Sequence, residues 1–181
     1  MKRISRRPPL TLLLLGSLAW TACAPEQEEP AVQTPKRIES ESMGIAVADL
    51  PADFEVVSNQ GLILELRTIG DSAGGTLVVE VTEELTGGIN LVAAAEAMQE
   101  WFEQQPDGQY FGNLELGTPT GPAFTSRGSY RSDQGEVEEL RVFALHPSEN
   151  RMVRMTFSYP PGEGKIRMQQ VVSVLGEIEG R

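Results

Sequence analysis

Few residues in the chain have the type and spacing that acid–base or metal chemistry requires. His146 is the only histidine among 181 residues, and its close neighbours in the sequence offer a single carboxylate, Glu149. A metal site or a proton-transfer pair needs further partners at defined spacing. We therefore expect His146 to be a solvated residue in a hairpin turn, and we expect the chain to have no catalytic residue.

Glycine pairs and runs of acidic residues are the residue types that phosphate and calcium sites use. The glycines at 74–75 and 87–88 lack the Lys-Ser/Thr pair and the strand-to-helix spacing of a phosphate loop. The acidic residues at 83–84 and 136–139 lack the D-x-D-x-D-G spacing of a calcium loop. The sequence therefore predicts turn-forming glycines, solvated acidic edges, and no metal or cofactor.

Two arginines, Arg141 and Arg154, fall on consecutive predicted strands. If Pro147 and Ser148 form the tip of the hairpin between them, Arg141 lies directly opposite Arg154. Like charges in that position destabilise a sheet. Three readings remain: a different register, ion pairs with acids of the same strands, or a contact for an anionic partner. We expect the ion pairs.

The first 22 residues have the pattern of an export signal. Four basic residues and no acid precede an apolar run at 10–20, which is shorter than the roughly 20 residues of a membrane span. The run ends in Trp20-Thr21-Ala22-Cys23, which resembles the lipobox of bacterial lipoproteins, with Trp20 where leucine is usual. The resemblance implies that Cys23 receives a diacylglyceryl group, that cleavage occurs before it, and that the new amino terminus is acylated with a fatty acid such as palmitate.

Residues 23–39 are expected to form a flexible acidic tether. Three prolines and three glutamates between 24 and 35 leave too little apolar surface to offset the entropy of ordering. Ala24 directly after the cysteine fits sorting to the outer membrane, facing the periplasm. Arg6-Arg7 leaves a twin-arginine export route open beside the general one.

The charge of the chain excludes several kinds of partner. It carries 15 basic and 26 acidic side chains, and removal of residues 1–22 leaves 11 basic ones and a net charge of about −15. A protein that binds nucleic acid or anionic lipid surfaces needs the opposite sign. We therefore expect no nucleic-acid partner, and a membrane bond made by the lipid alone.

Residues 40–181 have the length of a single domain, and most of it has the period of strands. Apolar residues alternate at 62–66 and again at 77–81, across a glycine-rich turn, which predicts a hairpin. Extended stretches at 110–116, 123–131, 136–145 and 151–159 are separated by turn residues and predict an antiparallel meander.

Two segments have the period of helices. Asn90 can cap a helix whose apolar face is Leu91, Ala94, Ala95, Met98, Trp101 and Phe102. A closing helix from Lys165 would place on one face Met168, Val171, Val172, Leu175 and Ile178. The order of elements predicts an α+β fold in which an antiparallel sheet is covered by two amphipathic helices.

This order of elements resembles the PsbP-like fold. The resemblance rests on Gly44-Ile-Ala-Val-Ala-Asp-Leu-Pro-Ala-Asp-Phe54, with Phe54 where tryptophan is commoner, and on a long hairpin that runs into a terminal amphipathic helix. It covers most of residues 43–178. The fold is shared by the photosystem protein PsbP, the Ran-binding Mog protein and small bacterial envelope lipoproteins, and it implies an α/β/α sandwich with an accessory or binding role. No functional residue can be carried over.

Two function classes follow. The first is a membrane-anchored envelope lipoprotein whose domain is a non-catalytic module that binds a protein or a small ligand. The second is an envelope hydrolase or other enzyme whose site is assembled from distant residues. An apolar patch or shallow pocket between sheet and helix favours the first, and a cleft with convergent polar groups around His146 favours the second.

Overall fold

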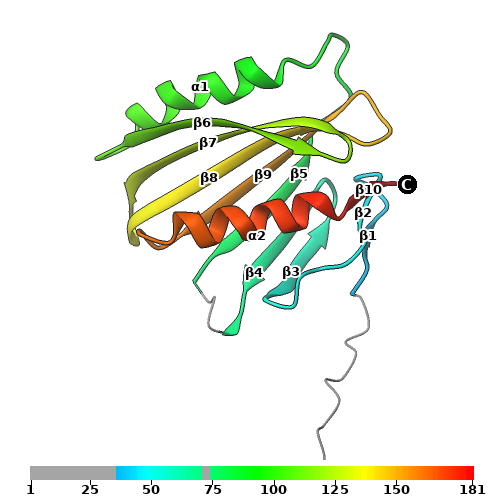
Figure 1. The fold of residues 1–181 in the computed structure, drawn as a ribbon, viewed down its shortest axis with the longest axis horizontal. Helices are drawn as coiled ribbons and strands as arrows, with labels where there is room; N and C mark the ends of the chain where they lie inside the picture. The colour runs from blue at the N-terminus through cyan, green and yellow to red at the C-terminus, as the bar shows by residue number, and fades with distance from the viewer. Residues whose placement is uncertain (1–35, 71–73) are drawn as a thin grey trace, which may run out of the picture. The chain divides into compact units, whose positions relative to one another are not determined.

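The computed structural model describes residues 36–70 and 74–181 (Figure 1). The seven strands of a large sheet and two helices make up most of this part of the chain, and three short strands form a second sheet. In chain order the elements are β1 (Ile38–Ser40), β2 (Ile45–Val47), β3 (Phe54–Gln60), β4 (Ile63–Thr68), β5 (Thr76–Val81), α1 (Leu91–Glu103), β6 (Gln109–Thr118), β7 (Gly121–Ser132), β8 (Gly135–Leu145), β9 (Met152–Tyr159), α2 (Gly164–Gly176) and β10 (Ile178–Gly180).

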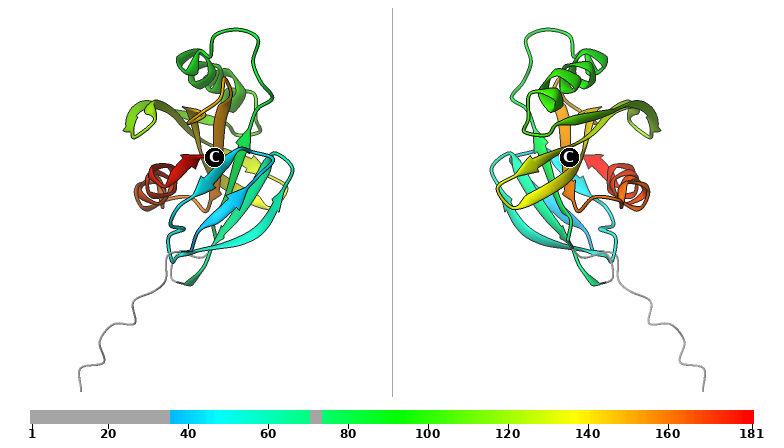
Figure 2. Two further views of the ribbon diagram at one scale, coloured as in Figure 1. Left: turned by 90° about the vertical axis from the view of Figure 1, so that its right-hand side faces the viewer. Right: turned by 90° about the vertical axis from the view of Figure 1, so that its left-hand side faces the viewer.

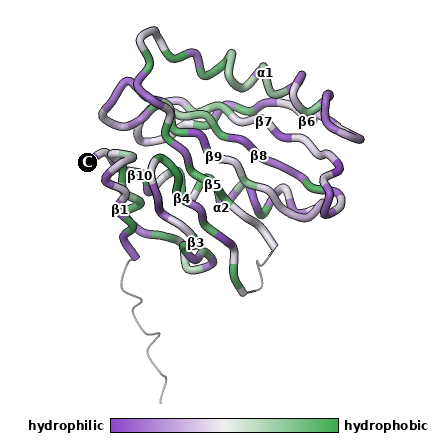
Figure 3. Tube along the Cα trace, turned by 180° about the vertical axis from the view of Figure 1, so that it is seen from behind, coloured by the Kyte–Doolittle hydropathy of each residue, from purple (hydrophilic) through white to green (hydrophobic). Residues whose placement is uncertain are grey.

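The large sheet is antiparallel throughout and has the strand order β3-β4-β5-β9-β8-β7-β6. The predicted β4–β5 hairpin and the β6–β9 meander are both present, which confirms the α+β class. Buried and less buried residues alternate strictly along β5 and β9, as expected of strands packed on one face. Figure 3 shows the hydropathy of the residues along these strands.

The two helices pack on opposite faces of this sheet. In β8, Val142 belongs to the core cluster that contains Val171 of α2, whereas the next residue, Phe143, belongs to the cluster that contains Leu91 of α1. Neighbouring residues of a strand point to opposite faces, so β8 is covered on both sides. The end-on views of Figure 2 show α1 and α2 on different sides of the sheet.

Helix α1 forms as its sequence predicts. The side chain of Asn90 accepts a hydrogen bond from the backbone N–H of Ala93 at 3.0 Å, which caps the first turn. The expected apolar face lies against β6, β7 and β8 and is buried or half-buried along its length. Phe102 is completely buried because Gly128 of β7 leaves room for its ring: a Cβ at 128 would lie 2.5 Å from Phe102 Cδ1.

Helix α2 buries most of the face that its sequence predicts. Val171 and Leu175 are buried, and Met168 packs against the same core. The expectation was wrong for Val172, which is 41% exposed, and it extended the helix too far: Ile178 is buried but lies in β10, beyond the end of α2 at Gly176. The apolar residues that α2 buries are Val171, Val174 and Leu175.

The remainder of the buried face of α2 is polar. Arg167 is 1% exposed, donates from Nη1 to the Gln170 side-chain oxygen at 3.0 Å, and forms an ion pair with Glu163. Gln170 in turn donates to the carboxylate of Asp53. Polar groups can be buried when their hydrogen bonds are satisfied, so this chain of contacts allows Arg167 and Gln170 to be buried beside the apolar residues of α2.

A three-stranded sheet with the order β1-β2-β10 joins the two ends of the domain. Its first strand begins at Ile38, two residues before the expected domain boundary at residue 40, and the backbone of Lys36 accepts a hydrogen bond from Leu50 N–H at 3.0 Å. Strands of three residues are too short to show an alternating pattern, so the sequence does not predict β1 or β10.

We predict that Phe102→Ala lowers the free energy of unfolding by about 3 to 5 kcal/mol, because it removes a fully buried ring and leaves a cavity between α1 and β7. Urea denaturation of the purified protein measures this change. A loss below about 1 kcal/mol would mean that the apolar face of α1 does not pack on the sheet.

Candidate functional site

A polar network lies between α1 and the sheet. Glu139 of β8 is 3% exposed and accepts an ion-pair hydrogen bond from Arg141 Nε. Its second oxygen accepts a hydrogen bond from the Tyr130 hydroxyl at 3.0 Å. The Arg141 guanidinium lies 3.7 Å from the ring centroid of Trp101, a cation–π contact, and donates to Met98 Sδ at 3.0 Å. Each charged group in the network therefore has partners.

Tyr130 occupies the edge of this network. Its ring meets Trp101 edge to face with centroids 5.5 Å apart. Burial, reinforced by the neighbouring Glu139 carboxylate, raises the pKa of Tyr130 to about 12. A phenol held neutral in this way donates a hydrogen bond and does not serve as a base near neutral pH.

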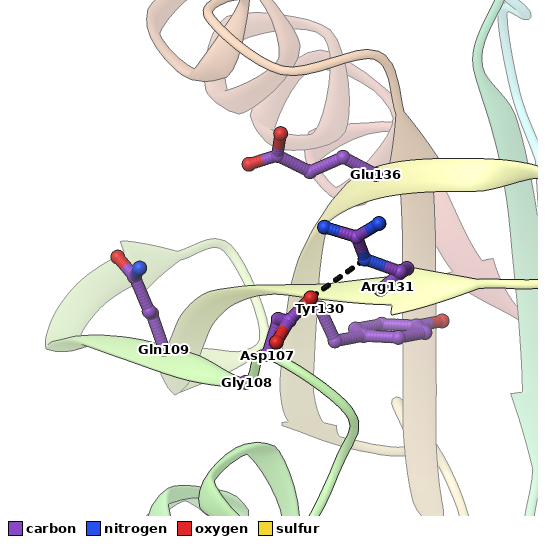
Figure 4. A pocket seen from close by; sticks show the side chains of 6 residues that line it. All are labelled: Asp107, Gly108, Gln109, Tyr130, Arg131 and Glu136. Carbon is purple, nitrogen blue, oxygen red and sulfur yellow. Dashed lines mark hydrogen bonds and ion pairs between the residues drawn. The ribbon is translucent and has the colours of Figure 1, made fainter.

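A polar hollow of about 520 Å³ opens beside Tyr130, where the turn after α1 meets the ends of β7 and β8 (Figure 4). Arg131 lies between Asp107, to which its Nε donates at 2.6 Å, and Glu136 of the neighbouring strand. The side chains of Arg131 and Asp107 are 69% and 67% exposed. Exposed ion pairs of this kind are solvated and weak.

A second hollow, of about 510 Å³, has mainly apolar walls. It lies at the N-terminal end of α1, between the loop that precedes the helix and the sheet beneath it. Val92 on its rim is 43% exposed, and Leu85 in the preceding loop is 36% exposed. Its lining residues are Gly88, Ile89, Asn90, Leu91, Val92, Pro122, Phe124 and Leu145. We call this feature the apolar hollow.

Arg141 and Arg154 do not face each other directly. The structure sets Arg141 opposite Thr156 and Arg154 opposite Phe143, so the expected register was wrong by two residues. The two arginines are diagonal neighbours on the α1 side of the sheet, and each has a carboxylate partner. Arg154 Nε donates to Glu80 at 2.8 Å, on a part of this face that α1 does not cover.

The contacts of His146 explain the change of register, and they also correct the expectation that this side chain is solvated. It is 5% exposed and not solvated as expected. Its Nδ1 accepts hydrogen bonds from the backbone N–H groups of Ser148 and Glu149 at 3.3 and 3.1 Å, so Nε2 donates to Met43 O at 3.0 Å. The backbone N–H of His146 bonds to Arg151 O at 3.0 Å, which moves the tip of the hairpin to residues 148–149. Both ring nitrogens are therefore used in structure.

One motif in the sequence was missed. Residues 70–74 read Gly-Asp-Ser-Ala-Gly, the spacing of a nucleophile elbow. An elbow connects a strand to a helix, whereas this segment connects β4 to β5, which pair as an antiparallel hairpin. The flanking strands are therefore arranged differently from the strand and helix of a nucleophile elbow. Residues 71–73 themselves lie outside the described part of the chain.

The remaining expectations concern the lipid anchor, the tether, metal binding and membrane-spanning helices. Cys23 and most of the tether lie in the part of the chain that the structure does not describe. Within residues 36–70 and 74–181, no three His, Cys, Asp or Glu side chains are grouped to hold a metal ion. No helix in the same residues is long and apolar enough to cross a membrane.

The sequence did not single out the apolar hollow. The sequence contains one signal for it: the apolar residues Ile89, Leu91 and Val92 flank the cap residue Asn90. A helix end at the surface requires fewer apolar residues than this. The contribution of β7 and β8 to the hollow depends on the tertiary fold and has no signal in the local sequence.

No protein-family model matches the chain, and no curated protein matches it by sequence. Solved structures share its fold. PsbP of Synechocystis (CyanoP) superposes with a TM-score of 0.57 at 10% identity and covers 87% of this chain and all of its own length, 100%. LpqN of Mycobacterium tuberculosis, described as involved in cell envelope biogenesis, gives 0.56 at 13% identity and covers 82% of this chain and 86% of LpqN.

The Ran-binding protein Mog1p of Saccharomyces cerevisiae is also similar, with a TM-score of 0.55 at 10% identity over 81% of this chain and 95% of Mog1p. These structures confirm that the domain has the α+β fold of PsbP and Mog1. At such low identity the similarity extends to the fold and not to the site.

The ion pairs of Arg141 and Arg154 differ in burial, so loss of the two arginines should have different effects on stability. Arg141→Gln leaves Glu139 buried without its cation and should lower the free energy of unfolding by about 3 to 5 kcal/mol. Arg154→Gln, whose side chain is 44% exposed beside Glu80, should cost at most about 1 kcal/mol. Urea denaturation of the two variants measures the difference. Equal losses would contradict the assignment of Arg141 as the buried structural partner.

Proposed function

We propose that the protein is a lipid-anchored component of the bacterial cell envelope whose PsbP-like α/β/α sandwich binds a partner and catalyses no reaction. Its partner is a protein segment or small ligand that presents an apolar group. The anchor is Cys23, and the acidic segment between Cys23 and Lys36 serves as the tether that holds the domain away from the membrane, on the periplasmic side of the outer membrane.

The apolar hollow is the observation that carries this proposal. Its volume of about 510 Å³ falls in the range of about 300 to 1,000 Å³ that small-molecule and side-chain pockets occupy. Ile89, Leu91 and Phe124 supply apolar walls, and the side-chain oxygen of Asn90 is occupied as a helix cap. A hollow that offers apolar contact and few free polar groups suits binding through apolar burial.

The positions of the reactive side chains support a non-catalytic role. His146 is buried, and both of its ring nitrogens hold backbone groups. Glu139 and Arg141 form an ion pair with each other. Glu139 also accepts a hydrogen bond from Tyr130, and Arg141 makes a cation–π contact with Trp101. A general base must reach the proton that it removes, and the hydrogen-bonding atoms of His146, Glu139 and Arg141 are engaged in these contacts. The Gly-Asp-Ser-Ala-Gly spacing at residues 70–74 favours the enzyme alternative, but it lies between the antiparallel strands β4 and β5, where a nucleophile elbow would connect a strand to a helix.

The anchor is supported by the sequence and by one structural neighbour. The lipobox-like Trp20–Cys23 segment accounts for a single cysteine in an exported chain, where an unpaired thiol is otherwise unusual. LpqN, which has the same fold, is described as involved in cell envelope biogenesis. The strong negative charge of the chain disfavours electrostatic attachment to anionic lipid, so the lipid would be the sole anchor.

Binding of an apolar probe tests the function of the hollow. Val92→Glu should weaken the binding of the fluorophore Nile red roughly tenfold, because the carboxylate desolvates poorly in the hollow. The matched control is Val172→Glu on α2, since the two valines are 43% and 41% exposed on helices. A glutamate in the first turn of α1 does not oppose the helix dipole. Equal effects of the two variants, or no effect of Val92→Glu, would contradict the assignment.

Fractionation of cells that express the full chain tests the anchor. Cys23→Ser should yield an unprocessed precursor or a soluble protein, whereas the unchanged chain sediments with membranes. Inhibition of the lipoprotein signal peptidase should accumulate the precursor of the unchanged chain. If Cys23→Ser protein sediments with membranes after its signal has been removed, another membrane contact exists and the lipid-only anchor is wrong.

A further inference from the structure

Strand β6 is one edge of the large sheet, and its outer side is open. It runs over ten residues and pairs only with β7 among the described strands. The other edge strand, β3, is partly covered: Asn59 donates to Glu39 O at 2.8 Å, and Ser42 donates to Gly61 O just beyond the strand. An uncovered edge presents unpaired backbone N–H and C=O groups that can pair with another strand.

The side chains of β6 do not protect this edge. Glu115 is the one charged residue between Gln109 and Thr118, whereas natural edge strands usually carry several charges or a proline. Phe111 and Leu114 are 42% and 54% exposed. A bulge lies between residues 110 and 112, and the pairing with β7 is regular from residue 112 to residue 118. The exposed edge therefore keeps a straight stretch long enough to pair with a short peptide.

A small hollow lies next to this edge, on the α2 side of the sheet. Its volume is about 220 Å³, and it is lined by Phe111, Gly112, Asn113, Leu114, Thr125, Arg127 and Met168. This is smaller than the roughly 300 Å³ at which small-molecule pockets begin. A strand added to a sheet edge points alternate side chains to each face, so one side chain of an added strand would reach this hollow.

Arg127 supplies the charge in the hollow. Within the described residues no carboxylate lies at ion-pair distance from its guanidinium, and its Nε is buried without an acceptor. Glu138 on the adjacent strand accepts a hydrogen bond from Gly162 N–H at 2.9 Å through Oε1, and its Oε2 lies near Gly164, as Arg127 Nη1 does, without forming an ion pair. The guanidinium carbon lies 5.1 Å from the ring centroid of Phe111. An arginine that has no ion-pair partner and has an aromatic neighbour is suited to a carboxylate.

From these observations we infer that the outer edge of β6 binds an extended peptide segment, which adds a strand to the sheet and inserts one acidic side chain toward Arg127. Main-chain hydrogen bonds to residues 113–118 supply affinity. Phe111, Leu114 and Met168 contact the aliphatic part of the inserted residue, and Arg127 pairs with its carboxylate. The site is separate from the apolar hollow and does not depend on it.

A peptide selection tests this inference. Random octapeptides displayed on phage are selected for binding to the full chain in detergent micelles. The enriched peptides should share an acidic residue flanked by apolar ones. Arg127→Gln should weaken the binding of an enriched peptide at least about tenfold. Replacement of the peptide's acidic residue by the corresponding amide should weaken binding to the unchanged protein by the same factor. The two changes together should weaken binding no more than either one alone. Amide hydrogen exchange at residues 113–118 should slow when the peptide binds.

Matched variants separate the site from general charge and from folding. Arg131→Gln removes an exposed arginine of the same strand that is paired with Asp107, and it should leave binding unchanged. Leu114→Asp places a negative charge on an exposed residue beside Arg127 and should abolish binding of the acidic peptide. Val92→Glu should have no effect. Circular dichroism confirms that each variant is folded.

Four results would overturn the inference: enriched peptides without an acidic residue, equal effects of Arg127→Gln and Arg131→Gln, binding that leaves exchange at residues 113–118 unchanged, or no enrichment at all. If dodecanoate binds in an Arg127-dependent way while no peptide is enriched, the hollow takes a carboxylated amphiphile and the peptide site is rejected.

Discussion

The constraint on which the rest of the structure depends is that β8 is buried on both faces. Val142 and Phe143 are consecutive, and each belongs to a different core cluster. Because successive side chains of a strand point to opposite faces, one helix cannot cover both. The chain therefore needs α1 over β6, β7 and β8, and α2 against β8 and β9 on the other side. Every polar group that β8 carries beneath α1 must then find its partners inside the protein.

This constraint explains the different behaviour of the arginines. Arg141 lies under α1, where Glu139, Trp101 and Met98 surround its guanidinium. Arg154 is its diagonal neighbour but lies on β9, to the side of the strands that α1 covers, so its ion pair with Glu80 is in contact with water. The interior uses the reactive side chains for structure, and the open surfaces are at the periphery: the hollow at the start of α1 and the edge of β6.

The sequence predicts the parts of the fold that have long periodic patterns. The Asn90 cap, the apolar face of α1 and the β6–β9 meander follow from local residues alone. Short-range patterns could not predict the three-residue strands β1 and β10. The length of the β8–β9 hairpin alone could not place its turn, because His146 in that turn is held by a hydrogen bond to Met43, a residue 103 positions away. The apolar residues around Asn90 indicate only one wall of the apolar hollow. The complete lining of that hollow and of the small hollow beside β6 could not be predicted, since each combines strands and a helix that are distant in the sequence.

The central claim is a rigid core built on β8, with surfaces for binding left at the edges. Amide hydrogen exchange of the unliganded protein tests it most directly. The account predicts that amides of β8 and β9 exchange only through global unfolding, while the loop at 83–90 and the outward amides of β6 exchange orders of magnitude faster. If amides of β8 exchange as fast as the outward amides of β6, the doubly covered strand does not hold the fold together and the account is wrong.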